Sequence, residues 1–229
     1  MEGALDVFDR IEVIGSGRVG SAVAARLRER GIAVTAEAPQ LRLLCVPDDA
    51  IPDVAQALTN GPGWIAHVSG ATSLSALDPH ERRFSVHPLQ TFTKARGAEQ
   101  LDGAWGAVTG ETEEARAAGT WLAETLGLRP FLLADDARPL YHAGAAIASN
   151  YLVTLQRAAA SLFEAAAAPP EALEPLMRRT IENGFELTGP IARGDWATVE
   201  RHREAIRAAR PELEHLYETL AGATVAIAL

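Results

Sequence analysis

A glycine-rich hexapeptide at residues 15–20 limits the folds open to this 229-residue chain more than any other feature. It reads Gly-Ser-Gly-Arg-Val-Gly, follows a short apolar run at residues 11–14 and precedes an alanine-rich stretch with helical spacing at residues 21–30. Gly31 ends the predicted helix, and residues 32–36 again have the pattern of a strand. Strand, tight turn, helix and strand in this order predict the βαβ unit of a Rossmann-type α/β domain.

Each glycine of the hexapeptide meets a different requirement of dinucleotide binding. Gly15 permits the tight turn, Gly17 lets the backbone approach a pyrophosphate, and Gly20 lets helix and sheet pack closely. The helix that follows supplies amide donors and a favourable dipole at its N-terminus. The predicted cofactor-binding residues of the loop are Gly15, Ser16, Gly17, Arg18, Val19 and Gly20. For Arg18 two roles remain open, a phosphate contact and an ordinary exposed helix residue.

The second βα unit of the predicted domain is truncated. Only residues 37–40 separate the strand at 32–36 from the next apolar run at 41–46, so the usual crossover helix is missing. Either these two strands are not parallel neighbours or the second is degenerate. Glu37 occupies the position of the acid that accepts the ribose hydroxyls in the dinucleotide fingerprint, where it would favour NAD, and it is equally a candidate turn residue.

The α/β alternation continues up to residue 133. Further strands are predicted at residues 64–68, 83–87, 105–109 and 130–133, with helices at 53–58 and 111–126. After Pro139 the pattern is helical, with helices predicted at residues 140–168, 171–184, 196–208 and 212 to the end. We therefore expect a Rossmann-like dinucleotide-binding domain at residues 1–136 and an all-α domain at 137–229.

The last predicted helix is more apolar than a solvated terminal helix requires. It carries Leu216, Leu220, Val225 and Ile227, which predicts packing on the helical bundle or on a second subunit. A homodimer, with the helical domain serving substrate binding and dimerisation, is the arrangement that we expect.

Composition excludes several classes of partner. The formal net charge of −9, with no offsetting cluster of Lys and Arg, argues against nucleic acid. The chain lacks a signal-peptide pattern at its start and any apolar run of about 20 residues, so no membrane contact and a cytoplasmic location are expected. Cys45 is the only cysteine and lies in an apolar strand, and the six histidines show no short ligand spacing, so no metal site is expected.

Several polar residues follow predicted strands, at the edge where open α/β sheets bind ligands. They are Pro47 and Asp48 after the strand at 41–46, Ser69 after the strand at 64–68, and His87 at the end of the strand at 83–87. We expect Pro47, Asp48 and Ser69 to contact the cofactor, and His87 to touch substrate or nicotinamide. Ser69 is equally suited to cap a helical segment that begins near Leu74.

The segment Gly-Pro-Ile-Ala-Arg-Gly-Asp at residues 189–195 has two interpretations. Arg193 and Asp195 are suited to clamp a substrate carboxylate, or to pair with each other while Asp195 caps the helix at 196–208. The capping role is favoured for Asp195, and both roles stay open for Arg193.

Three segments together resemble one bacterial family that joins a Rossmann-like domain to a C-terminal helical domain of unknown function. They are Cys-Val-Pro-Asp-Asp-Ala-Ile at 45–51, Ser-Val-His-Pro-Leu-Gln-Thr-Phe at 85–92, and the stretch from Tyr141 taken with residues 189–195. This family is similar to the 6-phosphogluconate dehydrogenase, pyrroline-5-carboxylate reductase and ketopantoate reductase group. The resemblance implies NAD(P)-dependent reduction of a small carbonyl or imine compound, with ketopantoate as the one named substrate.

The chain departs from that group at the proton donor. Several relatives place a catalytic Lys one helical turn before an Asn; here Asn150 is present, but the position one turn back is Ala146. On a continuous helix His142, Ser149 and Asn150 would share nearly one face, so His142 is the natural substitute for the Lys. His142 is equally suited to pack at the domain seam, and Asn150 to serve as a satisfied polar group between helices.

Two functional hypotheses follow. The first is a reductase that uses NAD or NADP, with His142, Asn150 and His87 as catalytic residues and a small-molecule substrate. The second, favoured by the truncated βα unit and the missing Lys, is a non-catalytic module that binds a nucleotide or small molecule and has kept the reductase fold.

Overall fold

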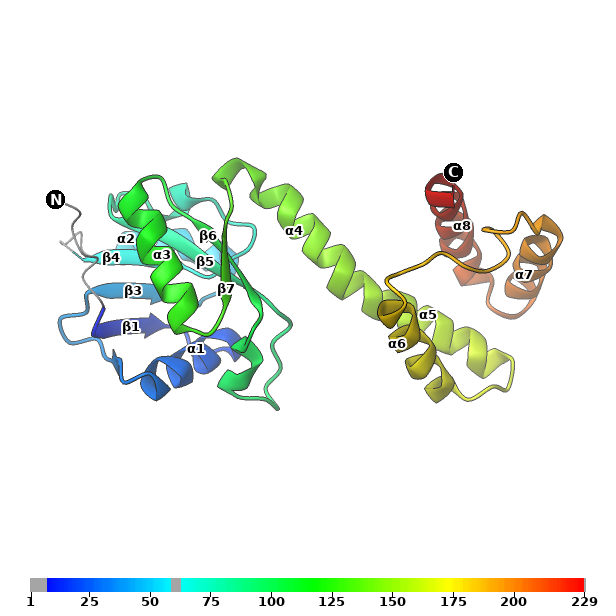
Figure 1. Cartoon of the computed structure of the whole chain (residues 1–229), viewed down its shortest axis with the longest axis horizontal. Helices are drawn as coiled ribbons and strands as arrows, with labels where there is room; N and C mark the ends of the chain where they lie inside the picture. The colour runs from blue at the N-terminus through cyan, green and yellow to red at the C-terminus, as the bar shows by residue number, and fades with distance from the viewer. Residues whose placement is uncertain (1–7, 59–62, 229) are drawn as a thin grey trace. The chain divides into compact units, whose positions relative to one another are not determined.

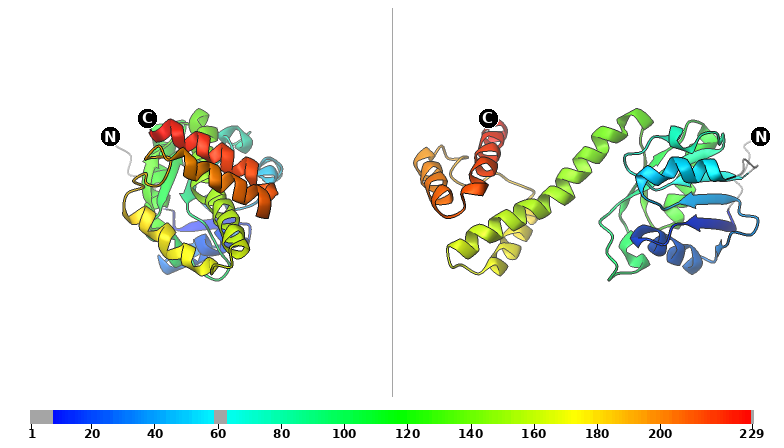
Figure 2. Two further views of the ribbon diagram at one scale, coloured as in Figure 1. Left: turned by 90° about the vertical axis from the view of Figure 1, so that its right-hand side faces the viewer. Right: turned by 180° about the vertical axis from the view of Figure 1, so that it is seen from behind.

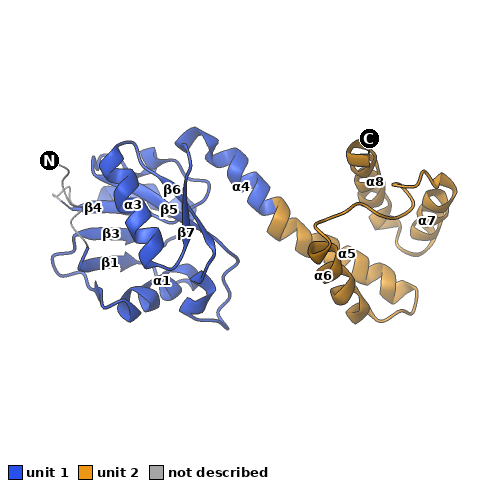
Figure 3. Ribbon diagram, in the orientation of Figure 1, with its two compact units in different colours: residues 1–146 blue, residues 147–229 orange. Residues whose placement is uncertain are grey.

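The computed structural model describes residues 8–58 and 63–228 of the chain. They belong to two compact units, residues 1–146 and 147–229 (Figure 3). In the described part of the first unit, seven strands form one sheet with helices on both faces, and the described part of the second is helical (Figure 1).

The strand order confirms one of the two alternatives for the truncated βα unit. The strands of the described residues are β1 (Arg10–Ile14), β2 (Ala33–Val34), β3 (Leu41–Leu44), β4 (Trp64–His67), β5 (Arg83–Leu89), β6 (Trp105–Thr109) and β7 (Arg129–Leu132). Their order is β2-β1-β3-β4-β5-β6-β7, so β2 and β3 lie on opposite sides of β1 and are not neighbours. β2 is also far shorter than the strand expected at residues 32–36.

The sheet is staggered, and this stagger shapes the site. Cross-strand pairing places five residues in one row, here called the strand-end row: Ile14, Leu44, His67, Ser85 and Thr109. β1, β3 and β4 end at this row. β5 continues for residues 86–89, which pair with residues 105–108 of the antiparallel β6, while β7 runs parallel to β6. The extension formed by residues 86–89 and 105–108, here called the wall, therefore rises beyond the carboxyl ends of the parallel strands.

Two hydrophobic clusters hold the layers together. The helices of the first unit are α1 (Arg18–Glu29), α2 (Ile51–Ala57), α3 (Glu113–Thr125) and α4 (Arg138–Ala146), with 3-10 turns η1 (Asp48–Ala50), η2 (Leu74–Leu77), η3 (Ala98–Leu101) and η4 (Asp135–Ala137). α1 and α3 pack on one face, where Leu27 and Leu122 share a cluster with Phe84. α2 and η2 cover the other face (Figure 2), where Ile51 packs with Leu44. Alternating side chains of the strands supply both clusters.

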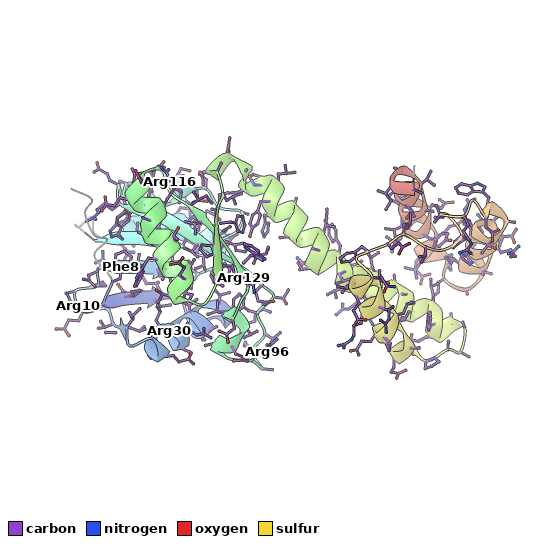
Figure 4. All side chains as sticks on the ribbon, viewed as in Figure 1. Phe8, Arg10, Arg30, Arg96, Arg116 and Arg129 are labelled. Atoms are coloured by element: carbon purple, nitrogen blue, oxygen red, sulfur yellow. The ribbon has the colours of Figure 1, made fainter. Side chains whose placement is uncertain are left out.

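Aromatic rings close the first cluster near the start of β1. Phe8, labelled in Figure 4, contacts Trp64 and Trp121 edge-on, and Trp64 contacts Phe84 in the same way. Cys45 lies in this cluster as expected for a core residue, and burial raises the pKa of its thiol to about 12.

The glycine loop is packed against the segment that directly follows β3. Gly15 has a φ of 114°, and a Cβ built on it would lie 2.3 Å from the Cys45 carbonyl oxygen. A Cβ on Gly20 would lie 2.0 Å from the Gly15 carbonyl oxygen. Both positions are therefore closed to any side chain, as the sequence pattern predicted for a strand-to-helix turn.

The described helical unit departs from the expected pattern at its start. One helix was expected at residues 140–168, but α4 ends at Ala146 and a π-helical turn, η5 (Ile147–Tyr151), follows. The remaining helices are α5 (Leu152–Ala165), α6 (Leu173–Glu182), α7 (Trp196–Ala209) and α8 (Glu214–Ala228), with 3-10 turns η6 (Pro170–Ala172) and η7 (Pro211–Leu213). Asp195 caps α7, its side chain accepting from the Thr198 amide at 3.1 Å.

None of the helices in the described residues has the length and apolarity needed to cross a membrane.

We predict that Gly20→Ala destabilises the first unit by at least about 2 kcal/mol, because its methyl group collides with a backbone carbonyl that cannot move away. Thermal unfolding followed by circular dichroism measures the effect. The control is Gly222→Ala in α8, where a built Cβ meets no described atom within 4 Å outside the local helix backbone and helix propensity adds up to about 1 kcal/mol. Equal melting temperatures for Gly20→Ala and the wild type would contradict the close packing of the loop.

Candidate active site

The glycine loop presents an open helix N-terminus. Gly17 is the N-cap of α1, no side chain bonds to the cap, and the first turn contains no acid. A Cβ on Gly17 would meet nothing within 4 Å in the described structure, in contrast to Gly15 and Gly20. Exposed backbone amides at a positive helix end suit the phosphate groups of a nucleotide, so these residues fit a dinucleotide.

A cavity of about 220 Å³ lies beside this helix start. It is lined by Ser16, Gly17, Arg18, Ser21, Ala22, Ala25, Thr93, Lys94, Arg96 and Gly97. Three of the lining side chains are cationic and none is acidic; one of them, Arg96, is labelled in Figure 4. Lys94 and Arg96 belong to the segment after β5, and the sequence pattern of the glycine loop did not predict their positive charge at this cavity.

Glu37 lies near the other end of β1. The turn that contains Glu37 is hydrogen-bonded to the first residue of that strand. Arg10 Nε donates to the Ala38 carbonyl oxygen at 3.0 Å, and the Gln40 amide donates to the Arg10 carbonyl oxygen at 3.0 Å. The glycine loop follows the carboxyl end of the same strand, so Glu37 and the loop lie toward opposite ends of β1.

Ser69 is engaged in a turn of its own. Its hydroxyl donates to Asp48 Oδ2 at 2.7 Å and accepts from the amides of Ala71 and Thr72 at 3.2 and 3.0 Å. The cap of η2 is Ser73 rather than Ser69. Pro47 precedes η1 at the same strand ends and is exposed, as is Asp48. Asp48 and Ser69 thus come together, as expected, at the carboxyl ends of neighbouring strands, and they are hydrogen-bonded to each other.

A cluster of one tyrosine and two histidines occupies the base of the wall. The Tyr141 hydroxyl lies 2.8 Å from Nδ1 of His87, and the ring centroids of His87 and His142 are 6.2 Å apart. Gly70 touches both imidazoles, since a Cβ built there would lie 2.8 Å from His142 Cδ2 and 2.9 Å from His87 Nε2. The expected pair His87 and His142 is therefore brought together, at the edge of the sheet that also carries the glycine loop.

The environment keeps His87 neutral. Burial lowers the pKa of His87 to about 4, with further lowering by His142 and Arg138 and an opposing effect of Asp48. Burial raises the pKa of Tyr141 to about 12, against a lowering effect of the Arg138 charge. At neutral pH the pair consists of an uncharged imidazole and a protonated phenol, which is a hydrogen-bonded pair that can donate a proton.

Arg138 anchors this cluster and is the main residue that sequence reasoning missed. It is fully buried and donates to Ser85 Oγ at 2.7 Å, to Thr109 Oγ1 at 2.8 Å and to the carbonyl oxygen of Ser69. Tyr141 was quoted only as part of a family segment. The spacing of Arg138, Tyr141 and His142 at i, i+3 and i+4 was the available signal, because such residues share one face of a helix.

Asn150 lies outside the first unit, in the π-helical turn η5. A π-turn adds a residue to the helical repeat, so the common face expected for His142, Ser149 and Asn150 on a continuous helix does not extend across it. The catalytic role expected for Asn150 stays a prediction.

The chain belongs to the family described as Domain of unknown function (DUF2520), whose profile matches residues 104–224, more than half of its length. No curated protein matches the chain.

Solved structures of low sequence identity share the fold. A Bacteroides fragilis protein provisionally described as an NADP oxidoreductase is 21% identical with a TM-score of 0.80, covering 95% of this chain and 98% of its own. A Thermotoga maritima protein is 24% identical with a TM-score of 0.77 and the same coverage. A reductive aminase from Aspergillus terreus, in complex with NADPH and ethyl levulinate, is 16% identical with a TM-score of 0.68, covering 96% of this chain and 94% of its own. The predicted fold class, a Rossmann-type domain followed by a helical domain of the 6-phosphogluconate dehydrogenase type, is confirmed.

We predict that acid destabilises the protein between pH 6.5 and pH 4. In the unfolded chain His87 takes up a proton near pH 6.5, but in the folded chain only near pH 4, so stability present above pH 6.5 is lost as the pH falls. His67, fully buried with a pKa of about 3, acts in the same direction. Urea unfolding at several pH values measures the loss. His87→Asn should reduce it, whereas His215→Asn, at an exposed position, should not; an identical acid loss in both variants would contradict the assignment.

Proposed function

We propose that this protein is an NAD(P)-dependent reductase of small carbonyl or imine compounds, acting in the cytoplasm. The observation that carries the proposal is the juxtaposition of His87, Tyr141 and His142 at the sheet edge that also carries an open glycine loop. The shared fold with proteins described as an NADP oxidoreductase and as imine reductases supports it.

The cofactor would lie on the loop at residues 15–20. Its phosphates would meet the amides at the start of α1, with Arg18 and Lys94 close by, and the bound nicotinamide would supply hydride to the substrate carbon. The cations of the cavity and the distance of Glu37 from the loop favour NADPH over NADH. In this assignment residues 1–136 bind the dinucleotide.

The Tyr141 hydroxyl is the proton donor in this proposal. In the neutral imidazole with its proton on Nδ1, His87 donates to the phenol oxygen and leaves the hydroxyl hydrogen free to point at the substrate oxygen or nitrogen. As that proton leaves, the phenolate is stabilised by the imidazole N–H and by the positive charge of Arg138. His142, exposed beside His87, is placed to return a proton from solvent. The Tyr141 pair thus replaces the lysine that is missing at position 146.

We predict that Tyr141→Phe lowers kcat by about 100-fold or more, because the proton donor is lost, while NADPH affinity stays unchanged. Calorimetry with NADPH and NADH gives the binding constants, and NADPH oxidation with ketopantoate and with small cyclic imines gives turnover. The matched control is Tyr217→Phe, which removes a similar hydrogen bond to His202 at 2.9 Å in the helical unit.

The possible outcomes separate the two hypotheses. Loss of turnover in Tyr141→Phe alone supports the proposed donor. Equal turnover in both variants contradicts that role. No binding of either dinucleotide at millimolar concentration would replace the reductase by the non-catalytic binding module.

The helical domain expected at residues 137–229, which includes the helical unit at 147–229, is proposed to bind substrate and to form a homodimer. In the described helices α5 and α8 no side chain is buried, and only Leu173, Val199 and Ile206 are buried apolar residues of the unit. Large apolar side chains stay exposed, among them Val153, Leu176, Ile181, Leu220 and Ile227. A unit with so few buried and so many exposed apolar side chains is stabilised by burying them in an interface, and a second copy of the chain would supply that interface.

We predict that Leu220→Asp weakens the dimer at least about tenfold, because it places a charge in an apolar interface. Sedimentation equilibrium over a range of concentrations gives the dissociation constant. Thr219→Asp, one position away in α8, is the control. A monomeric wild-type protein at high concentration would contradict the dimer.

A further inference from the structure

The proposed chemistry uses the positive charge of Arg138 but does not explain why this residue is buried or what its hydrogen bonds do. Arg138 is the first residue of α4 and has 0% exposure. Its ion pair with Asp135 is long, with 3.9 Å between Asp135 Oδ1 and Arg138 Nε. Burying a guanidinium with so little compensation is costly, so its hydrogen bonds need an explanation.

Those hydrogen bonds join three strands at one level of the sheet. Ser85 of β5 and Thr109 of β6 are paired in the strand-end row, and both hydroxyls accept from Arg138 Nη1. The Ser69 carbonyl, just beyond the end of β4, accepts from Nη2. Thr109 also donates to the Leu133 carbonyl at 2.9 Å, which ties the segment leading to α4 to the same point. The planar fork of Arg matches this arrangement, and the point charge of Lys does not.

A second clamp fixes the approach to α4. The Asp135 carboxylate accepts from the Ser73 hydroxyl at 2.5 Å and from the Leu74 amide at 3.1 Å, so it holds the start of η2. Between them, Asp135 and Arg138 fix the first turn of α4 to the sheet from two sides. Tyr141 and His142 follow on the helical face that carries Arg138.

We propose that Arg138 is a positioning residue, which sets the first turn of α4 so that Tyr141 meets His87 and which places a fixed positive charge beside that imidazole. The inference rests on the proposed function for its catalytic meaning, but the arrangement itself concerns only the described first unit. His87 is also faced by His142 and Tyr141 of α4 and by Asp48 of η1. Of these groups, Arg138 is the one cation that carries its charge at every working pH.

The charge is tested by NMR titration of the His87 ring in Arg138→Gln and Arg138→Lys. Burial is the main cause of the low pKa of His87, so loss of the Arg138 charge should raise this pKa measurably above about 4 without restoring its ordinary value, and Arg138→Lys should keep it near 4. The matched control is Arg26→Gln, which removes another buried guanidinium that bonds to carbonyl oxygens, of Leu126 and Ala98, away from the site. A folded Arg138→Gln in which His87 still titrates near pH 4 would overturn the proposal.

The positioning role is tested by Thr109→Val, which removes one acceptor and keeps the charge. Hydrogen exchange of the α4 amides should become about tenfold faster, while the pKa of His87 stays near 4. In Arg26→Gln the faster exchange should be confined to α1, η3 and the end of α3. Unchanged exchange of the α4 amides in Thr109→Val would overturn the positioning role. Thr109→Val therefore also tests the proposal if both Arg138 variants fail to fold.

These readouts are independent of turnover. If the protein binds no dinucleotide, the reductase assignment fails while the titration and exchange results still decide the role of Arg138. If it is active, Arg138→Gln should also move the acid limb of the kcat profile to higher pH, and Arg26→Gln should leave that limb in place.

Discussion

The guanidinium of Arg138 is the contact through which β5, β6, the segment after β4 and helix α4 are held in one arrangement. Its partners come from residues 69, 85 and 109, which are far apart in the sequence and close only because the strands share a register. A neutral side chain could satisfy some of these acceptors, but not all three at once. The positive charge has a second effect, since it disfavours protonation of His67 and His87 nearby.

The glycine loop depends on a different constraint, which is space. Gly15 and Gly20 are fixed by backbone oxygens within 2.3 Å of a built Cβ, whereas Gly17 meets nothing. Two glycines therefore serve the close packing of β1, α1 and the segment after β3, and the third leaves the helix end open. This division separates the tightly packed part of one short motif from its open part.

Much of this architecture was predictable from local sequence patterns. The glycine loop, the order of strands and helices, the core position of Cys45 and the capping role of Asp195 all follow from short-range rules. The pairing of Asp48 with Ser69 and of His87 with Tyr141 depends on register and on helix docking, which no single segment contains. The π-turn at residues 147–151 likewise has no signal in the 3.6-residue periodicity, so the continuous helix expected there was wrong. The shortness of β2, which pairs only with the first two residues of β1, likewise had no signal in the apolar pattern of residues 32–36.

The stagger of the sheet has a consequence for how the site can diversify. β1, β3 and β4 stop at the strand-end row, whereas residues 86–89 and 105–108 rise above it, with residues 105–108 also paired to β7. Side chains near the top of the wall, such as Leu89 and Trp105, are exposed. In the proposed reductase, substitutions in the wall would therefore alter which compound is accepted without changing the backbone of the glycine loop.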